Sequence, residues 1–484
     1  MDWTHRRTTL FLLLGALLFC EASDPDLITM MPGLLKQPSF NMYSGYLKGT
    51  ATANLHYWLI NSQHATTDPL IIWLSGGPGC STLYSALTNN GPFLVKPDGI
   101  NLDYNPSSWN MHANLLYIDA PIGTGFSYPS AFDPYESSYA SSDDQITENH
   151  YQALVSFFTK YPNFTINDIY LAGDGYAGVY VPLLMRKLES VSKEVPLQIK
   201  GFAVGNAWTS TELQDNSFVH YAYQHGIIGE TLWARLNYSC CVKGNCNFHN
   251  NTNLDCNQAL NATYREVNNI GINPYKVNGD CGSGVPTPLG MPSKDGFYHY
   301  STGVQHIFAN ASFVQRNQET LQRIPKWKLK ADLTCVNATA ATKYLTDPYV
   351  REALHITYES PQWQLCNATV DHDYVRMYPD MSSVYQALLN TYKYRILVFN
   401  GDQDAIHNFL GNQWFVTNLH RQEEVLWRPW LYTSAQSQDQ IAGFVMQYDN
   451  IAFLTIKNAG FWTARDQPLA TAQLIYNFIY KRPY

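Results

Sequence analysis

The sequence predicts an α/β domain with a largely parallel sheet, and three observations support this prediction. Short apolar runs alternate with longer helical patterns along most of the 484 residues. The short runs are almost continuously apolar, as is typical of strands buried between two layers of helices. One of them, Ile169–Ala172, ends in a glycine-rich turn that leads directly into a helical pattern. Strands and helices in this alternation imply a parallel sheet with helices on both faces.

The expected strands lie on both sides of an irregular central region. They are Leu70–Leu74, Asn114–Ile118, Ile169–Ala172, Gly201–Val204, Arg395–Asn400 and Ala452–Ile456. Longer helical patterns lie between them, for instance at Ala140–Lys160 and Pro468–Tyr480. With 45% hydrophobic residues and no low-complexity stretch, the chain has the composition of one large folded domain with an insertion, and a disordered chain is excluded.

The alternation is lost between about residues 210 and 347, where Asn, Cys and aromatic residues predominate. Ligands bind at the carboxyl ends of the strands in open α/β sheets. We therefore interpret residues 210–347 as an inserted cap over that end of the sheet. The cap divides the core into residues 23–209 and residues 348–484.

The first 22 residues have the pattern of a secretory signal peptide. Arg6 and Arg7 precede the apolar run Leu10–Phe19, and the small residues Ala22 and Ser23 follow it. A membrane anchor is the alternative, but the run is shorter than the ~20 residues that span a bilayer. We expect the mature chain to be secreted or lysosomal and to contain no membrane span.

The chain has nine cysteines, of which Cys20 lies in the signal peptide. The remaining even number predicts disulfides in a secreted protein, although spacing alone does not give their connectivity. A zinc site within Cys240–Cys256 is the competing interpretation. Its spacing matches no common zinc pattern, and secreted proteins fold in an oxidising compartment, so we expect no metal and no other cofactor.

Asn-x-Ser/Thr sequons predict that the product is a glycoprotein. They begin at Asn163, Asn237, Asn250, Asn261, Asn310, Asn337 and Asn367. The net charge of -8 is mild, and no cluster of Lys and Arg follows the pair Arg6 and Arg7. Nucleic acid is therefore excluded as a partner, and a peptide or another protein is expected.

The stretch Ile169–Val179, IYLAGDGYAGV, has the strand, sharp turn and helix pattern of a nucleophile elbow. In such an elbow a G-x-S pattern presents a serine at the end of a sheet strand. Position 175 is glycine in this chain, so the turn has no hydroxyl group. The local pattern is that of a hydrolase, but its nucleophile is missing.

Several longer motifs extend this observation to most of the chain. They are PGLLKQPSFNMYSGYLKG (32–49), LHYWLINSQ (55–63), WLSGGPGCSTL (73–83), YIDAPIGTGFSY (117–128), GDGYAGVYVP (173–182), AVGNAW (203–208), NGDQDAIHNFLGNQWFV (400–416), IAGFV (441–445) and IAFLTIKNAG (451–460). From about Pro32 to Tyr484 the chain resembles the serine carboxypeptidases, peptidase family S10. The resemblance implies an α/β-hydrolase fold and an enzyme that removes C-terminal residues from peptides at acidic pH with a Ser, His, Asp triad.

The resemblance places the triad serine at Gly175, the acid at Asp404 and the histidine at Phe461, so only Asp404 has the expected side chain. Glycine cannot form an acyl-enzyme, and phenylalanine cannot transfer a proton from a hydroxyl to a leaving amine. Triad members act as a unit, and loss of the serine or the histidine of subtilisin costs on the order of 10⁶ in turnover. We therefore expect no carboxypeptidase activity.

The resemblance also assigns the supporting residues. The oxyanion hole is assigned to the backbone N–H groups of Gly77 and Tyr176, and both positions are retained. Glycines in this loop are also needed for tight turns, so their presence does not by itself indicate catalysis.

The family binds the C-terminal carboxylate of its substrate with a Trp, an Asn and two acids that share a proton. The corresponding residues here are Trp73, Ser75, Asn89 and Asp174. Serine replaces the Asn, Asn89 replaces one acid, and Asp174 is shorter by one methylene than the other. Recognition of a free C-terminus is therefore expected to be impaired.

The remaining polar residues of the site have simple structural interpretations. Without its histidine, Asp404 is expected to hydrogen-bond to neighbouring backbone, since buried carboxylates normally have partners. His407 is a candidate replacement base, but position 175 offers it no nucleophile. Tyr176 and Tyr180 are interpreted as walls of the pocket.

The resemblance further implies four disulfides, which pair Cys80 with Cys366, Cys240 with Cys256, Cys241 with Cys246 and Cys281 with Cys335. Every cysteine of the mature chain has a partner in this scheme. The structural framework is thus expected to be complete although the catalytic side chains are lost.

We therefore expect a catalytically inactive glycoprotein that acts by binding. One member of the family protects lysosomal glycosidases in a complex and members tend to dimerise, so the resemblance implies a scaffold for a second copy or for other lysosomal or secreted hydrolases. A carrier of peptides in the former substrate pocket is a second form of binding. The alternative is a hydrolase or acyltransferase with a rewired site, which would need another nucleophile or a water activated by Asp404 or Asp174.

Overall fold

The computed structural model describes residues 24–50, 53–63, 67–130, 139–192, 196–269, 271–281 and 335–484. The expected signal peptide, the sequon at Asn310 and residues 282–334 of the expected cap lie outside the described residues. None of the helices in the described ranges is both long enough and apolar enough to cross a membrane.

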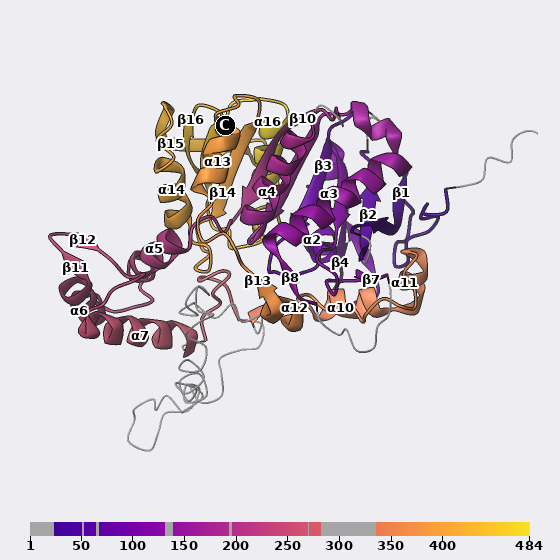
Figure 1. Cartoon of the computed structure of the whole chain (residues 1–484). Helices are drawn as coiled ribbons and strands as arrows, with labels where there is room; N and C mark the ends of the chain where they lie inside the picture. The colour runs from indigo at the N-terminus through magenta and orange to yellow at the C-terminus, as the bar shows by residue number, and fades with distance from the viewer. Residues whose placement is uncertain are drawn as a thin grey trace, which may run out of the picture.

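One large sheet forms the centre of the molecule (Figure 1). Its strands follow the order β1-β2-β6-β3-β9-β10-β14-β17-β16-β15. The inner strands from β6 to β17 are parallel and coincide with the apolar runs of the sequence; they are β6 (Asn114–Ile118), β3 (Leu70–Ser75), β9 (Ile169–Asp174), β10 (Ile199–Gly205), β14 (Arg395–Gly401) and β17 (Ile451–Ile456). The prediction of an α/β domain with a mostly parallel sheet is confirmed.

Antiparallel strands extend the sheet at both edges and are absent from the sequence-based prediction. At one edge lie β1 (Met42–Lys48) and β2 (Ala53–Ile60), and at the other lie β16 (Asp439–Tyr448) and β15 (Glu423–Thr433). Most residues of β15 are exposed, and only Trp430 is buried. A strand of this kind has no continuous apolar run, so periodicity alone does not reveal it.

Helices cover both faces of the sheet (Figure 1). One face packs against α3 (Asp143–Lys160), α4 (Ala177–Ser190), α13 (Ser382–Leu389) and α14 (Phe409–Thr417). The other packs against α2 (Thr82–Thr88), α10 (Thr339–Thr346), α11 (Pro348–Ala353) and α16 (Pro468–Ile479). Helix α3 begins at Asp143 rather than at Ala140, because Ser142 caps it by accepting a hydrogen bond from the Gln145 amide.

The described part of the irregular region contains α5 (Thr211–Gln224), α6 (Glu230–Cys240) and α7 (Leu254–Asn269), which lie below the sheet in Figure 1. These helices share a third cluster of buried side chains that includes Phe218, Leu236 and Leu260. Ala405, in the turn after β14, belongs to the same cluster. The helices therefore pack at the carboxyl end of β14, a position that suits a cap, while its boundaries at 210 and 347 remain predictions.

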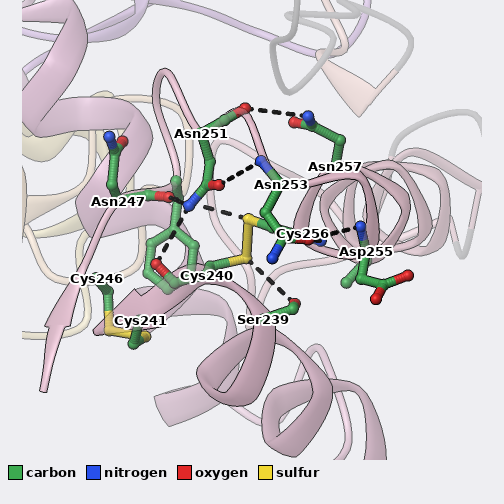
Figure 2. Close-up of a disulfide and its surroundings, with 12 residues drawn as sticks. Ser239, Cys240, Cys241, Cys246, Asn247, Asn251, Asn253, Asp255, Cys256 and Asn257 are labelled. Carbon is green, nitrogen blue, oxygen red and sulfur yellow. Dashed lines mark hydrogen bonds between the residues drawn. A yellow bond between two sulfur atoms is a disulfide. The ribbon is translucent and has the colours of Figure 1, made fainter. Parts of the chain in front are cut away.

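Four disulfides are present, and they are the four that the family resemblance implies. Figure 2 shows the pair Cys240–Cys256, which joins the end of α6 to α7. Asn251 lies beside this disulfide (Figure 2). Its side-chain Nδ2 donates to Cys240 O at 3.3 Å, and its Oδ1 accepts from the backbone N–H of Asn253 at 2.9 Å. The short hairpin next to this pair is closed by Cys241–Cys246.

The sequon at Asn367 is expected to carry no glycan in the folded protein. Its Nδ2 atom, the point of glycan attachment, donates to Gly123 O at 2.9 Å, and its Oδ1 accepts from the Thr369 amide as the cap of α12 (Ala368–Asp373). The residue is 7% exposed, whereas Asn163 and Asn237 are exposed on the surface. Peptide mapping after enzymatic deglycosylation in ¹⁸O-water should show conversion at Asn163 and Asn237 and none at Asn367; full conversion at Asn367 would contradict this expectation.

Candidate active site

The turn after β9 has the backbone of a nucleophile elbow. β9 ends at Asp174, Gly175 has a φ of 59°, and α4 begins at Ala177. The Gly175 amide donates to Gly205 O at 3.1 Å, and the Trp208 amide donates to Gly175 O at 2.8 Å. A residue with a Cβ atom pays roughly 1–2 kcal/mol for this left-handed conformation, whereas glycine adopts it readily. The left-handed turn of a nucleophile elbow is therefore present, with a glycine at the position that the family resemblance assigns to the serine.

Phe461 fills the space into which a side chain at position 175 would project. A Cβ atom built on Gly175 would lie 3.0 Å from Phe461 Cζ and 3.3 Å from Phe461 Cε2. These distances are shorter than the 3.5–4.0 Å or so at which carbon atoms pack best. The Phe461 ring is held by contacts with Tyr275 at 5.7 Å and Trp462 at 4.9 Å between ring centroids. The positions assigned to the triad serine and histidine are thus adjacent, and a serine at position 175 would require the Phe461 ring to shift.

Asp404 is completely buried and hydrogen-bonded. Its carboxylate accepts from the side-chain amide of Asn206 at 2.8 Å and from the backbone amide of Ile406 at 2.9 Å. Burial raises the pKa of Asp404 to about 7, and the hydrogen bonds oppose part of this shift. A neutral acid bound to an amide and to backbone is a stable structural arrangement without a histidine.

His407 lies beside the elbow. Its Cε1 atom would be 3.7 Å from a Cβ atom on Gly175, which is an ordinary contact distance. The imidazole packs against Trp208 at 5.5 Å and Phe461 at 5.8 Å between ring centroids. An imidazole is therefore adjacent to the place of the nucleophile, but glycine gives it no hydroxyl group to deprotonate.

The glycine loop after β3 packs directly against the elbow. The Gly76 amide donates to Asp174 O at 3.0 Å, and a Cβ atom on Gly76 would lie 2.0 Å from Tyr176 N. Only glycine allows so close an approach. The segments that carry the two implied oxyanion donors, Gly77 and Tyr176, are therefore held side by side.

Tyr176 and Tyr180 are both buried, with exposed fractions of 4% and 1%. Their rings meet edge to face at 5.2 Å, and the Tyr176 hydroxyl donates to the buried Asp143 carboxylate at 3.0 Å. Burial raises the pKa of both phenols, so neither is suited to act as a nucleophile at neutral or acidic pH.

Three of the residues assigned to carboxylate binding are bonded to one another. Trp73 Nε1 donates to Ser75 Oγ at 3.2 Å, and the Ser75 hydroxyl hydrogen-bonds the Asp174 carboxyl group. Burial raises the pKa of Asp174 to about 7, and hydrogen bonds from Ser75 and the Gly76 amide oppose part of this shift. The groups that would bind the C-terminus of a substrate are thus used within the protein.

Asn89, the fourth of these residues, supports the loop after β17. Its Oδ1 accepts from the Arg465 backbone amide at 2.9 Å, and the residue is 5% exposed. The Arg465 guanidinium stacks on Trp462 at 4.7 Å and lies 3.6 Å from the Asp466 carboxylate. A neutral amide at position 89 cannot share a proton with Asp174 as a second acid would.

Residues 274–277, from the irregular region, bridge the loops that carry two of the assigned triad positions, Asp404 and Phe461. Their contacts are Ala405 N to Pro274 O at 2.9 Å, Phe461 N to Tyr275 O at 2.8 Å, Lys276 Nζ to Asp466 at 3.2 Å and Val277 N to Gln403 O at 2.9 Å. This segment fixes the backbone of Phe461 in the position from which its ring reaches Gly175. The sequence gives no sign of it, because residues 274–277 carry no periodic pattern and lie far along the chain from their partners.

Stability is expected to fall as the pH rises from about 4 to above 7, because Asp404 and Asp174 both have raised pKa values. An aspartate in the unfolded chain releases its proton near pH 4, while these buried acids keep theirs to about pH 7. Their protonated forms therefore stabilise the folded state below about pH 4, and this contribution is lost as the pH rises from about 4 to above 7. Each pKa unit corresponds to about 1.4 kcal/mol. The thermal midpoint should be higher at pH 5 than at pH 8.

Asp404→Asn and Asp174→Asn should each reduce the slope of midpoint against pH, and the matched variant of an exposed residue, Asp103→Asn, should leave it unchanged. A midpoint that rises between pH 5 and pH 8, or slopes unaffected by both buried substitutions, would contradict this prediction.

The sequence and its relatives identify the family. The sequence model described as "Serine carboxypeptidase" matches residues 32–481. The chain belongs to the serine carboxypeptidase family.

Within the residues that the structure describes, no group of three or more His, Cys, Asp or Glu side chains is placed to hold a metal ion.

Relatives of this serine carboxypeptidase-family chain cover nearly its whole length. It is 41% identical over 469 residues to the lysosomal protective protein of Mus musculus, covering 96% of this chain and 95% of the relative. It is 31% identical over 488 residues to the serine carboxypeptidase ctsa-4.1 of Caenorhabditis elegans, covering 98% and 97%. A prohormone-processing carboxypeptidase of Saccharomyces cerevisiae has the same fold, with a TM-score of 0.68, 21% identity and coverage of 93% and 94%.

The structure brings the residues assigned by family resemblance into one region. Phe461 and His407 are in contact and lie beside the position that a Cβ atom on Gly175 would take, and Gly77 and Tyr176 lie on adjoining segments. Two contributors were not assigned a role from the sequence: Asn206, which bonds Asp404, and Tyr275, which holds Phe461. Asn206 lies within the family motif AVGNAW, so that motif was the available signal.

Proposed function

We propose that this chain is a secreted or lysosomal glycoprotein that lacks carboxypeptidase activity and acts by binding other proteins. The observation that carries the proposal is the contact between positions 175 and 461, where the Phe461 ring would lie 3.0 Å from a Cβ atom on Gly175. Covalent catalysis needs a nucleophile with a base in hydrogen-bond reach. In this chain position 175 carries no nucleophile. The apolar ring of Phe461 stands at the position of the base and also fills the space that a side chain at position 175 would occupy.

Protein binding is better supported than peptide transport in the former substrate pocket. The residues assigned to the substrate carboxylate bond one another, since Trp73 donates to Ser75 and Ser75 bonds Asp174. Residues 274–277 are hydrogen-bonded to the neighbouring loops that carry Asp404 and Phe461. A peptide would have to displace these contacts, whereas a protein that binds the outer surface would not.

The proposed partners are other lysosomal or secreted hydrolases. The mouse relative, at 41% identity, is named lysosomal protective protein. A protective role requires a stable scaffold rather than a triad, and the four disulfides supply such a framework. A chain without a complete triad is therefore still suited to act as a protective scaffold.

The test is to mix the purified glycoprotein at pH 5 with each of a panel of purified lysosomal glycosidases. A complex should appear in analytical ultracentrifugation, and the bound glycosidase should survive a protease that degrades it alone. Serum albumin in equal amount controls for nonspecific protection. Absence of any complex, together with peptides released from the natively purified protein by acid, would favour the peptide carrier and contradict the scaffold.

A residual hydrolase is the second candidate, and the position of His407 favours it. Its imidazole lies next to the elbow and could assist a water molecule, with the amides of Gly77 and Tyr176 as oxyanion donors. An oxyanion hole and binding alone give about 10³ to 10⁴ over the uncatalysed reaction. Slow hydrolysis of a blocked dipeptide that is lost in both His407→Ala and Asp404→Asn would support this candidate.

A further inference from the structure

Two disulfides begin at the adjacent residues Cys240 and Cys241, and they differ in burial. Cys240 is the last residue of α6 and is 2% exposed, and its partner Cys256 is 0% exposed. Cys241 and Cys246 are both half-buried, and they close the hairpin formed by the short strands β11 (Cys241–Val242) and β12 (Asn245–Cys246). One disulfide is therefore internal and the other lies at the surface.

Polar groups surround the buried disulfide. Ser239 Oγ lies 3.7 Å from Cys240 Sγ, and Asn247 O lies 4.0 Å from Cys256 Sγ. The side chain of Asn251 bonds Cys240 O on the same side (Figure 2). Thiol–disulfide exchange requires that a thiolate approach one of the sulfur atoms directly. These groups and the surrounding core therefore protect the Cys240–Cys256 pair.

The hairpin around the second disulfide is open to solvent. Residues 242–245 are all exposed. Lys243 and Gly244 have φ values of 51° and 84°, as in the tight two-residue turns that join antiparallel strands. Cys241 lies directly opposite Cys246 in the register of the strands. The disulfide thus crosses a short exposed hairpin close to its tip.

The two remaining disulfides are less accessible than this one. Cys80 and Cys366 are half-buried, but the residues before and after each of them along the chain are all buried. In the pair Cys281–Cys335, Cys335 is 9% exposed. Exposed disulfides are the ones that react with thiols most readily. Of the four disulfides, Cys241–Cys246 is therefore expected to react first.

This disulfide is also the one whose opening should cost the fold least. Its cysteines are separated by 5 positions in the sequence, whereas those of the other three are separated by 16, 54 and 286. In the chain-entropy model the stabilisation by a disulfide grows with the length of the loop that it closes. Cys240–Cys256 still joins α6 to α7 when the shorter loop opens. The domain should therefore stay folded.

We propose that Cys241–Cys246 is a thiol–disulfide exchange site that takes a small thiol such as glutathione or free cysteine. The thiolate of the small molecule attacks Cys246 Sγ and forms a mixed disulfide. The bond between the two cysteines breaks, and Cys241 Sγ leaves as a thiolate that takes up a proton. Attack occurs at Cys246 because both of its chain neighbours are exposed, whereas Cys241 follows the buried Cys240.

The step is reversible within the hairpin. The thiolate of Cys241 can attack the mixed disulfide on Cys246, which restores the original bond and releases the small thiol. The turn at Lys243 and Gly244 keeps the two strands paired, so Cys241 remains opposite Cys246. The site therefore closes again when the small thiol is removed.

The surroundings of the hairpin favour a small anionic thiol over the thiol of a protein. Lys243 is the only charged residue between Cys241 and Cys246. A nearby ammonium group favours the approach of an anion and the departure of a thiolate. Exposed sequons at Asn237 and Asn250 precede and follow the hairpin, and glycans expected there would hinder a protein but not a small molecule. This inference does not depend on the proposed lack of activity.

The test is to incubate the native glycoprotein with glutathione at pH 7, to quench samples with iodoacetamide over time, and to map every cysteine by tandem mass spectrometry. We expect glutathione on Cys246 and the alkyl group on Cys241, formed at least about tenfold faster than modification of any other cysteine. The reaction at pH 5 should be roughly a hundredfold slower, because the thiolate fraction falls about tenfold for each pH unit below the thiol pKa.

Two small thiols of opposite charge test the role of Lys243. Lys243→Gln should slow the reaction with glutathione, which is anionic, by roughly two- to fivefold, the effect of an exposed charge pair. It should not slow the reaction with cysteamine, which is cationic. The matched control is Lys96→Gln, directly after β4 (Phe93–Val95) and outside this hairpin, and it should leave both rates unchanged.

Hydrogen exchange of the glutathione-treated wild type shows whether the protein stays folded. Exchange should become faster in residues 241–247 and stay unchanged in α5 and α14. The proposal is overturned if no adduct forms, if another disulfide reacts first or equally fast, or if only unfolded molecules are modified. It is also overturned if a thiol protein such as thioredoxin opens the disulfide and glutathione does not.

Discussion

The double variant Gly175→Ser/Phe461→His is expected to be labelled by a fluorophosphonate probe, whereas neither single variant is. Serine alone would meet the Phe461 ring, whose Cζ atom is 3.0 Å from the new Cβ position. An imidazole ring is smaller and lacks that Cζ atom, so it removes the contact and supplies a base at the same time. Because triad members act as a unit, each single variant should react at least about 10³-fold more slowly than the double variant.

The double variant with Asp404→Asn added is the control, and it should react more slowly, since Asp404 occupies the acid position of the triad. If Gly175→Ser alone is labelled as fast as the double variant, then position 461 is not the base. His407, which would lie 3.7 Å from the new Cβ atom, would then have to be that base. A folded double variant that is not labelled would show that the supporting site has also been lost.

Gly175→Ala is expected to destabilise the protein by roughly 2–4 kcal/mol, the sum of left-handed backbone strain and overpacking against Phe461. Combining it with Phe461→Ala should cost less than the sum of the single changes, because the truncated side chain leaves room for the added methyl group. Contacting residues typically show coupling of about 0.5–3 kcal/mol. Urea unfolding of the four proteins at pH 5 measures this coupling.

Gly226→Ala is the matched control for the backbone term. Gly226 has a φ of 66°, close to that of Gly175, and a Cβ atom there would meet nothing within 4 Å. It should cost only the backbone strain of roughly 1–2 kcal/mol and show no coupling to Phe461→Ala. Additive effects of Gly175→Ala and Phe461→Ala would contradict the contact described between the two positions.

The inner sheet was predictable from the sequence because its strands are buried on both faces. A run such as Ile169–Ala172, buried at every position, reads as a continuous apolar segment. The outer strands were not predictable in this way. In β15 the exposed Trp427 and Leu431 stand on one side and polar residues interrupt the pattern, so its role depends on a partner strand that the sequence does not specify.

The sequence also predicted that Gly175 and Phe461 stand at the positions of the family's serine and histidine, but it did not predict how the two residues lie relative to each other. Gly175 and Phe461 lie far apart along the chain. Only the fold shows that the Phe461 ring occupies the space into which a side chain at position 175 would project. Tyr275 was missed for a similar reason: its ring packs on Phe461 and its backbone oxygen accepts from the Phe461 amide, but the two residues lie far apart along the chain. Backbone contacts of this kind leave no mark in the amino-acid pattern.

The buried polar groups of the candidate site have hydrogen-bond partners within the protein. Asp404 bonds Asn206, and Asp174 bonds Ser75, so each acid has partners that do not depend on a substrate. Buried polar groups without partners are costly, and retained hydrogen bonds therefore stabilise the loops around the elbow. Their presence is compatible with a scaffold, and it does not require turnover.

The most direct test of the central proposal is to incubate the purified wild-type glycoprotein with a blocked dipeptide and with a fluorophosphonate probe between pH 4.5 and 7.5. The double variant Gly175→Ser/Phe461→His serves as the positive control in the same buffers. We expect neither cleavage nor labelling by the wild type while the double variant is labelled. The proposal would be contradicted if the wild type cleaved the dipeptide, if this activity co-purified with the protein, and if Asp404→Asn abolished it. Such a result would require a nucleophile other than residue 175.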